Sequence, residues 1–185
     1  MNGTTAVTVD AKPEPLAIDL DRTAVLVIDM QNDFGTIGGM FERAGIDISG
    51  IRATIGPTSR LLAAARSHKI PIIYIAEALS SDHSDIGPAN SPHGRMAQRM
   101  GIGQPVTAPD GRPSHIHIEG TWHTEIIPEL APLPDEPVII KRRWSGFHGT
   151  TLNQTLTTIG ARYLVVTGCT TSNCIESTIR DAADG

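Results

Sequence analysis

The chain has 185 residues, with 15 lysines and arginines against 20 aspartates and glutamates, and a formal net charge of −5. This length suits one domain with a sizeable core, and the acidic balance without a basic run argues against a nucleic-acid partner. The two cysteines lie five positions apart, which argues against a disulfide framework and fits a reducing compartment. We expect a cytoplasmic protein with neither a signal peptide nor a membrane span.

The first 20 residues are predicted to form an extended arm, because Pro13 and Pro15 disfavour a helix there. A single domain is then expected over residues 21–185. It opens with residues 23–28, a continuous β-branched apolar run that is typical of a central strand covered on both faces.

A helix and a second strand are expected next. Residues 35–50 are rich in glycine and are predicted to form a loop. A helix is predicted over residues 57–69, with Pro57 in its first turn. Residues 70–76 form a second buried apolar run. This alternation of strand and helix predicts parallel βαβ units.

Residues 79–120 differ in composition, being rich in Gly, Pro, Ser, Asp and His. One short helix is expected inside them, over residues 93–100. A connection this long within a compact domain is usually functional. We therefore predict a lid or an oligomer contact here.

The last part of the chain repeats the strand and helix pattern. A strand over residues 138–140 ends at Lys141, a helix follows over residues 150–159, and another strand is expected over residues 163–167. Cys174 then falls in the first turn of the last helix. Free backbone N–H groups and the helix dipole favour a thiolate at such a position.

Together these elements predict an α/β fold with three layers, in which a doubly wound, Rossmann-like, mostly parallel sheet carries helices on both faces. Because parallel strands end at one edge of a sheet, Asp29, Lys141 and Cys174 should converge there. A nucleophilic thiol needs a base and a nearby cation, roles that Asp29 and Lys141 could fill. Each residue alone also has an ordinary explanation, as a turn cap, a solvated lysine or a buried cysteine.

Three separated motifs resemble the isochorismatase-like cysteine hydrolases. They are VIDMQNDF at residues 27–34, KRRWSGF at residues 141–147 and TGCTTSNC at residues 167–174. Residues 120–122 (GTW) and 174–178 (CIEST) are most similar to the ureidoacrylate and biuret amidohydrolases. The resemblance implies cleavage of a C–N bond in a small ureide or carbamoyl amide, through a covalent acyl-enzyme intermediate and without a cofactor.

The resemblance also implies the role of each residue in the triad. Asp29 would accept the thiol proton, Lys141 would help to activate the thiol, and Cys174 would attack the carbonyl. The family places a cis peptide bond at what is here Cys169–Thr170, so that the N–H groups of Thr170 and Cys174 would hold the oxyanion. Cys169 would then serve packing and backbone geometry.

Five further residues are predicted to contact the substrate. Two aromatic side chains are expected on the pocket wall and three other side chains at its polar rim: Phe34 and Phe147 on the wall, and Gln31, Asn32 and Trp122 at the rim. Aromatic residues beside a sheet are, however, more often part of the core.

One branch of the family, the nicotinamidases, binds zinc after the second strand. Candidate ligands in the matching region are Asp82, His83, His93, His115 and His117. They lack the spacing of that branch, so no metal is expected. A zinc-dependent, nicotinamidase-like deamidase remains an alternative.

Members of the family usually continue beyond the helix that carries the nucleophile. The resemblance therefore predicts a C-terminally shortened fold, and a second alternative is an inactive or oligomerising binding domain. Our preferred hypothesis is a homo-oligomer, dimeric or tetrameric, that acts on a small ureide.

Overall fold

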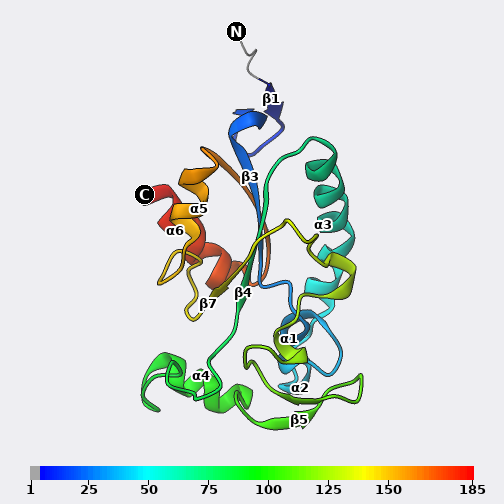
Figure 1. Ribbon diagram of the computed structural model, residues 1–185, viewed down its shortest axis with the longest axis vertical. Coiled ribbons are helices and arrows are strands. Elements are labelled where there is room, and N and C mark those ends of the chain that lie inside the picture. The colour runs from blue at the N-terminus through cyan, green and yellow to red at the C-terminus, as the bar shows by residue number, and fades with distance from the viewer. Residues whose placement is uncertain (1–4) are drawn as a thin grey trace.

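The computed structural model describes residues 5–185 and is built around a parallel sheet (Figure 1). The sheet has four strands in the order β7-β4-β3-β8. Their bounds are Thr23–Ile28 for β3, Ile72–Glu77 for β4, Val138–Lys141 for β7 and Tyr163–Gly168 for β8. The four apolar runs of the sequence therefore form the four strands, displaced by no more than two residues at either end.

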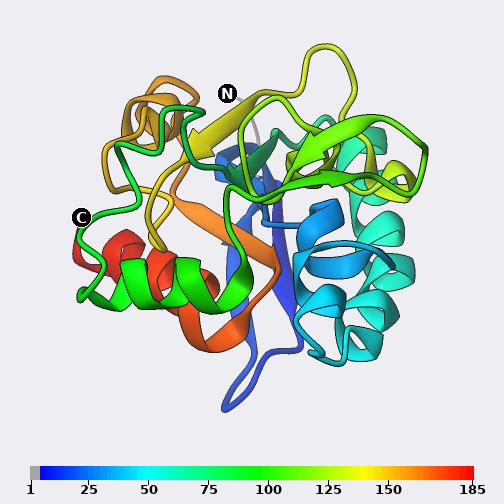
Figure 2. The same cartoon turned by 90° about the horizontal axis from the view of Figure 1, so that it is seen from below.

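Helices cover both faces of this sheet, which confirms the three-layer α/β fold. Helix α3 (Ser49–Ser67) lies on one face, and α5 (Leu152–Thr158) and α6 (Glu176–Asp184) lie on the other (Figures 1 and 2). The two layers of core follow from the alternation of side chains along each strand.

Strand β3 shows this alternation most clearly. Val25 and Val27 pack with the α3 side of the core, whereas Leu26 and Ile28 pack with the α5 side. The two cysteines are divided in the same way. Cys169 belongs to the first cluster of buried residues and Cys174 to the second.

Helix α3 begins eight residues earlier than the sequence predicted. It starts at Ser49, so Pro57 lies in its interior and not in its first turn. Pro57 removes a backbone hydrogen bond to the carbonyl of Ala53. Both residues are on the exposed face of the helix, where water can satisfy that carbonyl.

The glycine-rich segment 35–50 is not entirely a loop. The short helix α1 (Asn32–Gly35) ends in it, and α2 (Met40–Arg43) lies within it. Met40 is buried in the core cluster on the α3 side. Tertiary packing of this side chain stabilises a helical turn that the local composition disfavours.

The predicted N-terminal arm folds back on itself. Strands β1 (Ala6–Val9) and β2 (Leu16–Asp19) pair antiparallel, and most of their side chains are exposed. Residues 1–4 of the arm lie outside the described residues. The division between an arm and a domain at residue 21 stays a prediction.

Most of the long segment between β4 and β7 lies at the end of the sheet opposite this hairpin, and its last residues return along the sheet to the start of β7 (Figure 1). It contains the expected helix α4 (Pro92–Met100) and a small hairpin of β5 (Pro105–Thr107) and β6 (Pro113–His115). Two 3₁₀ turns follow, η2 (Trp122–Thr124) and η3 (Pro128–Leu130). Its role as a lid or an oligomer contact stays a prediction. Within residues 5–185, no helix combines the length and apolar character needed to cross a membrane.

Candidate active site

The carboxyl edge of the sheet gathers a small cluster of ionisable side chains. Its members are Asp29 after β3, Glu77 at the end of β4, Lys141 at the end of β7 and Cys174 in the π-helical turn η4 (Thr171–Ile175) after β8. All four are buried, with no more than 5% of any of them exposed. The structure thus brings together the three residues predicted from the strand ends and adds a fourth.

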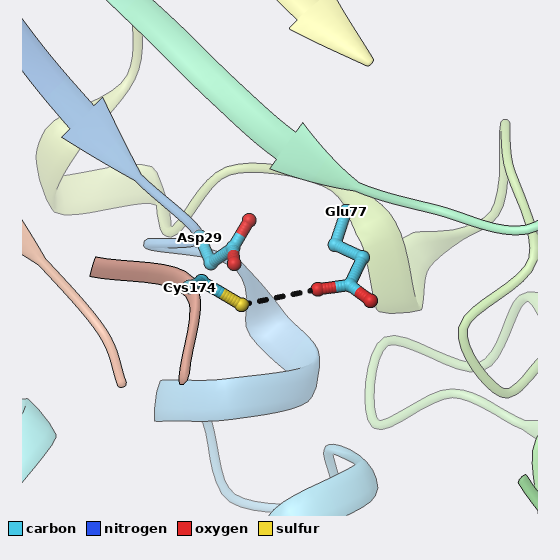
Figure 3. A group of neighbouring side chains, drawn as sticks. All are labelled: Asp29, Glu77 and Cys174. Carbon is cyan, nitrogen blue, oxygen red and sulfur yellow. Dashed lines mark hydrogen bonds between the residues drawn. The ribbon is translucent and has the colours of Figure 1, made fainter. Parts of the chain in front are cut away.

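The ammonium group of Lys141 lies between the other three side chains. Its Nζ is 2.9 Å from Oδ2 of Asp29, 2.5 Å from Oε2 of Glu77 and 3.3 Å from Sγ of Cys174. The thiol itself donates to Oε2 of Glu77 across 3.3 Å, as the dashed line in Figure 3 marks. One cation therefore contacts a thiol and two carboxylates.

Glu77 is the member of the cluster that the sequence analysis missed. It follows the buried run that was predicted to end at Ala76, so it occupies the same kind of position as Asp29 and Lys141. The rule that polar residues at strand ends point into the crevice would have selected it. Its backbone is held there by Gln31, whose Oε1 accepts the Glu77 N–H at 2.8 Å.

The backbone aims Asp29 into the cluster. This residue has φ of +54°, in the left-handed region that aspartate tolerates better than most residues. Its N–H donates to the carbonyl of Ile75 at 2.8 Å, and its own carbonyl accepts from Sγ of Cys169 at 3.1 Å. The first bond continues the pairing of β3 with β4, and the positive φ then turns the chain away from strand direction at Asp29.

The two carboxyl groups experience different environments. Burial raises the pKa of Asp29 to about 6, because Lys141 only partly offsets the cost of desolvating its charge and the charge of Glu77 adds to it. Burial also acts to raise the pKa of Glu77, but contacts with His117 and Lys141 outweigh it and hold that pKa well below its usual range. Asp29 is therefore the carboxylate that can exchange a proton near neutral pH.

Cys174 is protonated in the free chain, which differs from the expectation of a resting thiolate. Burial raises the pKa of its thiol, and the negative charges of Asp29 and Glu77 raise it further, more than Lys141 lowers it. The pKa of Lys141 is itself raised, because the neighbouring carboxylates outweigh the effect of burial. A thiolate at this site thus requires a proton transfer within the cluster.

The segment before Cys174 has the geometry that the resemblance implied. The peptide bond between Cys169 and Thr170 is cis. The carbonyl of Thr170 accepts from the N–H groups of Asn173 and Ile175, each at 3.2 Å. The role of the Thr170 and Cys174 N–H groups toward an oxyanion stays a prediction.

Comparison with known proteins identifies the family. The model of the isochorismatase domain matches residues 23–185. The chain belongs to the isochorismatase family. It is accordingly a hydrolase.

Several relatives carry a more specific name. Ureidoacrylate amidohydrolase RutB of Variovorax paradoxus is 36% identical over 172 residues, which cover 93% of this chain and 67% of that protein. The protein of the same name from Agrobacterium fabrum is 35% identical over 176 residues, covering 95% and 76%. Among solved structures, a cysteine hydrolase from Pseudomonas syringae pv. phaseolicola aligns with a TM-score of 0.71 and 29% identity, covering 90% of this chain and 68% of that one.

Gln31 and Asn32 were predicted to lie at the polar rim of the substrate pocket. Their side-chain amides instead donate hydrogen bonds to backbone carbonyls within the fold. Nε2 of Gln31 donates to the carbonyls of Glu77 and Thr124, each at 2.9 Å. Nδ2 of Asn32 donates to the carbonyl of Trp122 at 2.8 Å. These bonds tie the end of β3 to neighbouring backbone and favour a supporting role.

The aromatic candidates are separated from one another. Phe34 packs edge-on against Phe41 and lies in the core on the α3 side, whereas Phe147 packs on the α5 side. Trp122 is buried against the edge of His123, with ring centroids 5.1 Å apart. Their contact with a substrate stays a prediction.

The histidines considered as zinc ligands do not assemble with Asp82. Asp82 and His83 are exposed, and His93 stacks on Trp144 with ring centroids 4.6 Å apart. Within residues 5–185, the single group of metal-ligating atoms within 4.8 Å of one another is Asp29, Glu77 and Cys174. The ammonium of Lys141 lies among these atoms and already supplies their positive charge.

His117 has a different environment from the other loop histidines. It is buried, with Nδ1 at 3.1 Å from Oδ2 of Asp33 and Nε2 at 4.0 Å from Oε1 of Glu77. Burial alone would lower its pKa, but these two carboxylates raise the pKa of His117 to about 9. The sequence offered no signal for this, because nothing in the spacing distinguishes His117 from the exposed His115.

Proposed function

We propose that the chain is a cysteine amidohydrolase that cleaves a C–N bond of a small ureide or carbamoyl amide, of the ureidoacrylate or biuret kind. The observation that carries this proposal is the position of the Lys141 ammonium, which contacts both the Cys174 thiol and the Asp29 carboxylate. The names of the relatives at 35–36% identity support the substrate class.

The first half-reaction forms a covalent intermediate. The Cys174 thiol gives its proton to Asp29 as the sulfur attacks the carbonyl carbon, and the oxygen becomes an oxyanion. Lys141 stabilises the sulfur charge that develops. The N–H groups of Thr170 and Cys174 would hold the oxyanion, where one lost donor costs about 3 kcal/mol of barrier. The C–N bond then breaks, and the nitrogen leaves with the proton from Asp29.

The second half-reaction restores the enzyme. Water attacks the acyl carbon and gives a proton to Asp29, the C–S bond breaks, and the sulfur recovers that proton. Because the pKa of Asp29 is about 6, its carboxylate is suited to accept and return a proton near neutral pH. This exchange motivates the assignment of Asp29, rather than Glu77, as the acceptor.

The test is ammonia release by the purified chain from ureidoacrylate, biuret and N-carbamoyl amino acids. Cys174→Ala should abolish release, and Cys169→Ser should retain it, because serine keeps a donor for the Asp29 carbonyl. Mass spectrometry of the quenched wild-type reaction should find the acyl group on the peptide that contains Cys174. Hydrolysis that survives Cys174→Ala would exclude the nucleophile. Light scattering on the same sample would test the expected dimer or tetramer.

A further inference from the structure

A row of buried charged side chains leads away from Lys141, and it begins with Glu77, which also accepts from the Cys174 thiol. Glu77 contacts Lys141 through Oε2 and faces His117 through Oε1, and His117 in turn contacts Asp33. The other oxygen of Asp33 accepts the N–H of Met40 at 3.0 Å. Glu77, His117 and Asp33 are as buried as the cluster itself, and the reaction steps above use none of the three.

Two carboxylates face the imidazole of His117, Asp33 from α1 and Glu77 from β4. His123 of η2 lies beside the other oxygen of Asp33, with Nε2 at 3.9 Å from Oδ1. The ring of Phe34 closes a further side, edge-on with centroids 5.6 Å apart. His123 is not a competing cation, because burial lowers its pKa and its Nδ1 is bonded to Ser114 at 2.7 Å. His117 is therefore the positive member of this group.

Glu77 and Asp29 differ in the number of cations beside them. His117 stands between Asp33 and Glu77, and Lys141 stands between Glu77 and Asp29. Glu77 thus has two cationic neighbours, His117 and Lys141, whereas the one cation beside Asp29 is Lys141, which also contacts Glu77. Without His117, a single ammonium would face both carboxylates, and neither would be distinguished as the base.

We propose that His117 is a positioning residue whose imidazolium, held by Asp33, keeps Glu77 as the ionised partner of Lys141 and so leaves Asp29 to accept the Cys174 proton. The inference rests on the proposed function for the role of Asp29. It also gives the 79–120 segment a part in the site, because His117 belongs to that segment and the segment's backbone is joined to β4 by the bond from Leu79 N–H to the His117 carbonyl, at 2.9 Å.

The test compares His117→Asn with His115→Asn. The asparagine at position 117 can still donate to Asp33 but places no charge beside Glu77, and His115 is an exposed histidine on the same segment. The measurement is the rate of Cys174 alkylation by iodoacetamide against pH, without substrate, with the labelled peptide identified by mass spectrometry. This readout follows the charge around the thiol, which a merely structural residue would not move.

Removal of a positive charge near the thiol disfavours its ionised form. The midpoint of the alkylation profile should move upward by about one pH unit in His117→Asn. Below the midpoint, Cys174 should then be labelled about tenfold more slowly than in the wild type at the same pH. The profile of His115→Asn should coincide with that of the wild type. A midpoint unchanged in folded His117→Asn would overturn the proposal.

A second measurement needs no substitution and decides the matter if His117→Asn does not fold. In wild-type protein with ¹⁵N-labelled histidine, the two ring nitrogens of His117 should show the imidazolium pattern at pH 7.5. A neutral imidazole there would overturn the proposal. Neither readout uses hydrolysis. Failure of the ureide assays would therefore contradict the proposed function, whereas this inference is tested by the pH profile of Cys174 alkylation and by the ring nitrogens of His117.

Discussion

The Cys174 thiol donates to Glu77, with 3.3 Å between Sγ and Oε2, although Asp29 is the carboxylate whose pKa lies near neutrality. Geometry in the free chain and proton affinity thus favour different bases. Hydrogen bonds of catalytic groups often rearrange when substrate binds, so the resting contact does not decide between them. Substitution of Asp29 and of Glu77 can decide which of them accepts the proton.

We predict that Asp29→Asn and Glu77→Gln affect the pH dependence of kcat/KM in different ways. In the wild type, activity should rise with pH through about 6, because Asp29 must be ionised to accept the proton. Asp29→Asn should remove this limb and lower kcat/KM by about 10²- to 10⁴-fold. Glu77→Gln should keep the limb but move it to lower pH, because the charge of Glu77 raises the pKa of Asp29. The reverse pattern would make Glu77 the base.

Lys141→Met should inactivate the protein and also destabilise it. The substitution keeps a long side chain but leaves Asp29 and Glu77 buried without their shared cation. Removing one partner of a buried ion pair costs about 3–5 kcal/mol. Urea unfolding would measure this loss, with the exposed Lys69→Met as the control. A stability equal to that of the wild type would contradict the ion pairing described here.

Gly168→Ala should be strongly destabilising. Gly168 has φ of +127°, and a Cβ there would lie 1.9 Å from the carbonyl oxygen of Ile28 on the paired strand β3. The strands would have to separate next to Asp29, at a cost of about 3 kcal/mol. Gly111→Ala is a matched control, because Gly111 also has positive φ, at +86°, but open space around it. Similar losses in the two variants would show that backbone strain alone, not the close approach, sets the cost.

His117 should make stability depend on pH above neutrality. Its pKa is about 9 in the folded chain against an ordinary value of 6.5, so the folded state holds the proton more tightly. The resulting stabilisation is complete below pH 6.5 and is lost as the pH rises toward 9, in total of order 3 kcal/mol. The difference in free energy of unfolding between wild type and His117→Asn should therefore shrink over this interval. A difference that stays constant would mean that His117 does not change its proton affinity on folding.

The sheet could be predicted from the sequence because each central strand is a continuous apolar run. Residues 23–28 are such a run, and every side chain in it is buried on one face or the other. The convergence of Asp29, Lys141 and Cys174 followed from topology alone, since parallel strands end together. Glu77 obeyed the same rule and was missed because the strand was taken to end one residue too early.

Other features depend on contacts that no local pattern records. The start of α3 at Ser49 was missed because Pro57 was read as a first-turn residue, although a proline on an exposed face can remain inside a helix. The environment of His117 depends on Asp33, which is 84 positions earlier in the chain. Its raised pKa is a property of the folded state and has no signature in residues 79–120.

Because the two cysteines lie on opposite faces of the sheet, each thiol can report on the helical layer that covers it. Cys169 is buried on the α3 side and Cys174 on the α5 side, although only four residues separate them. The dependence of each thiol's labelling rate on denaturant concentration would therefore report how readily the helical layer over that thiol detaches. The same dependence for both thiols would indicate that the two layers open as one cooperative unit.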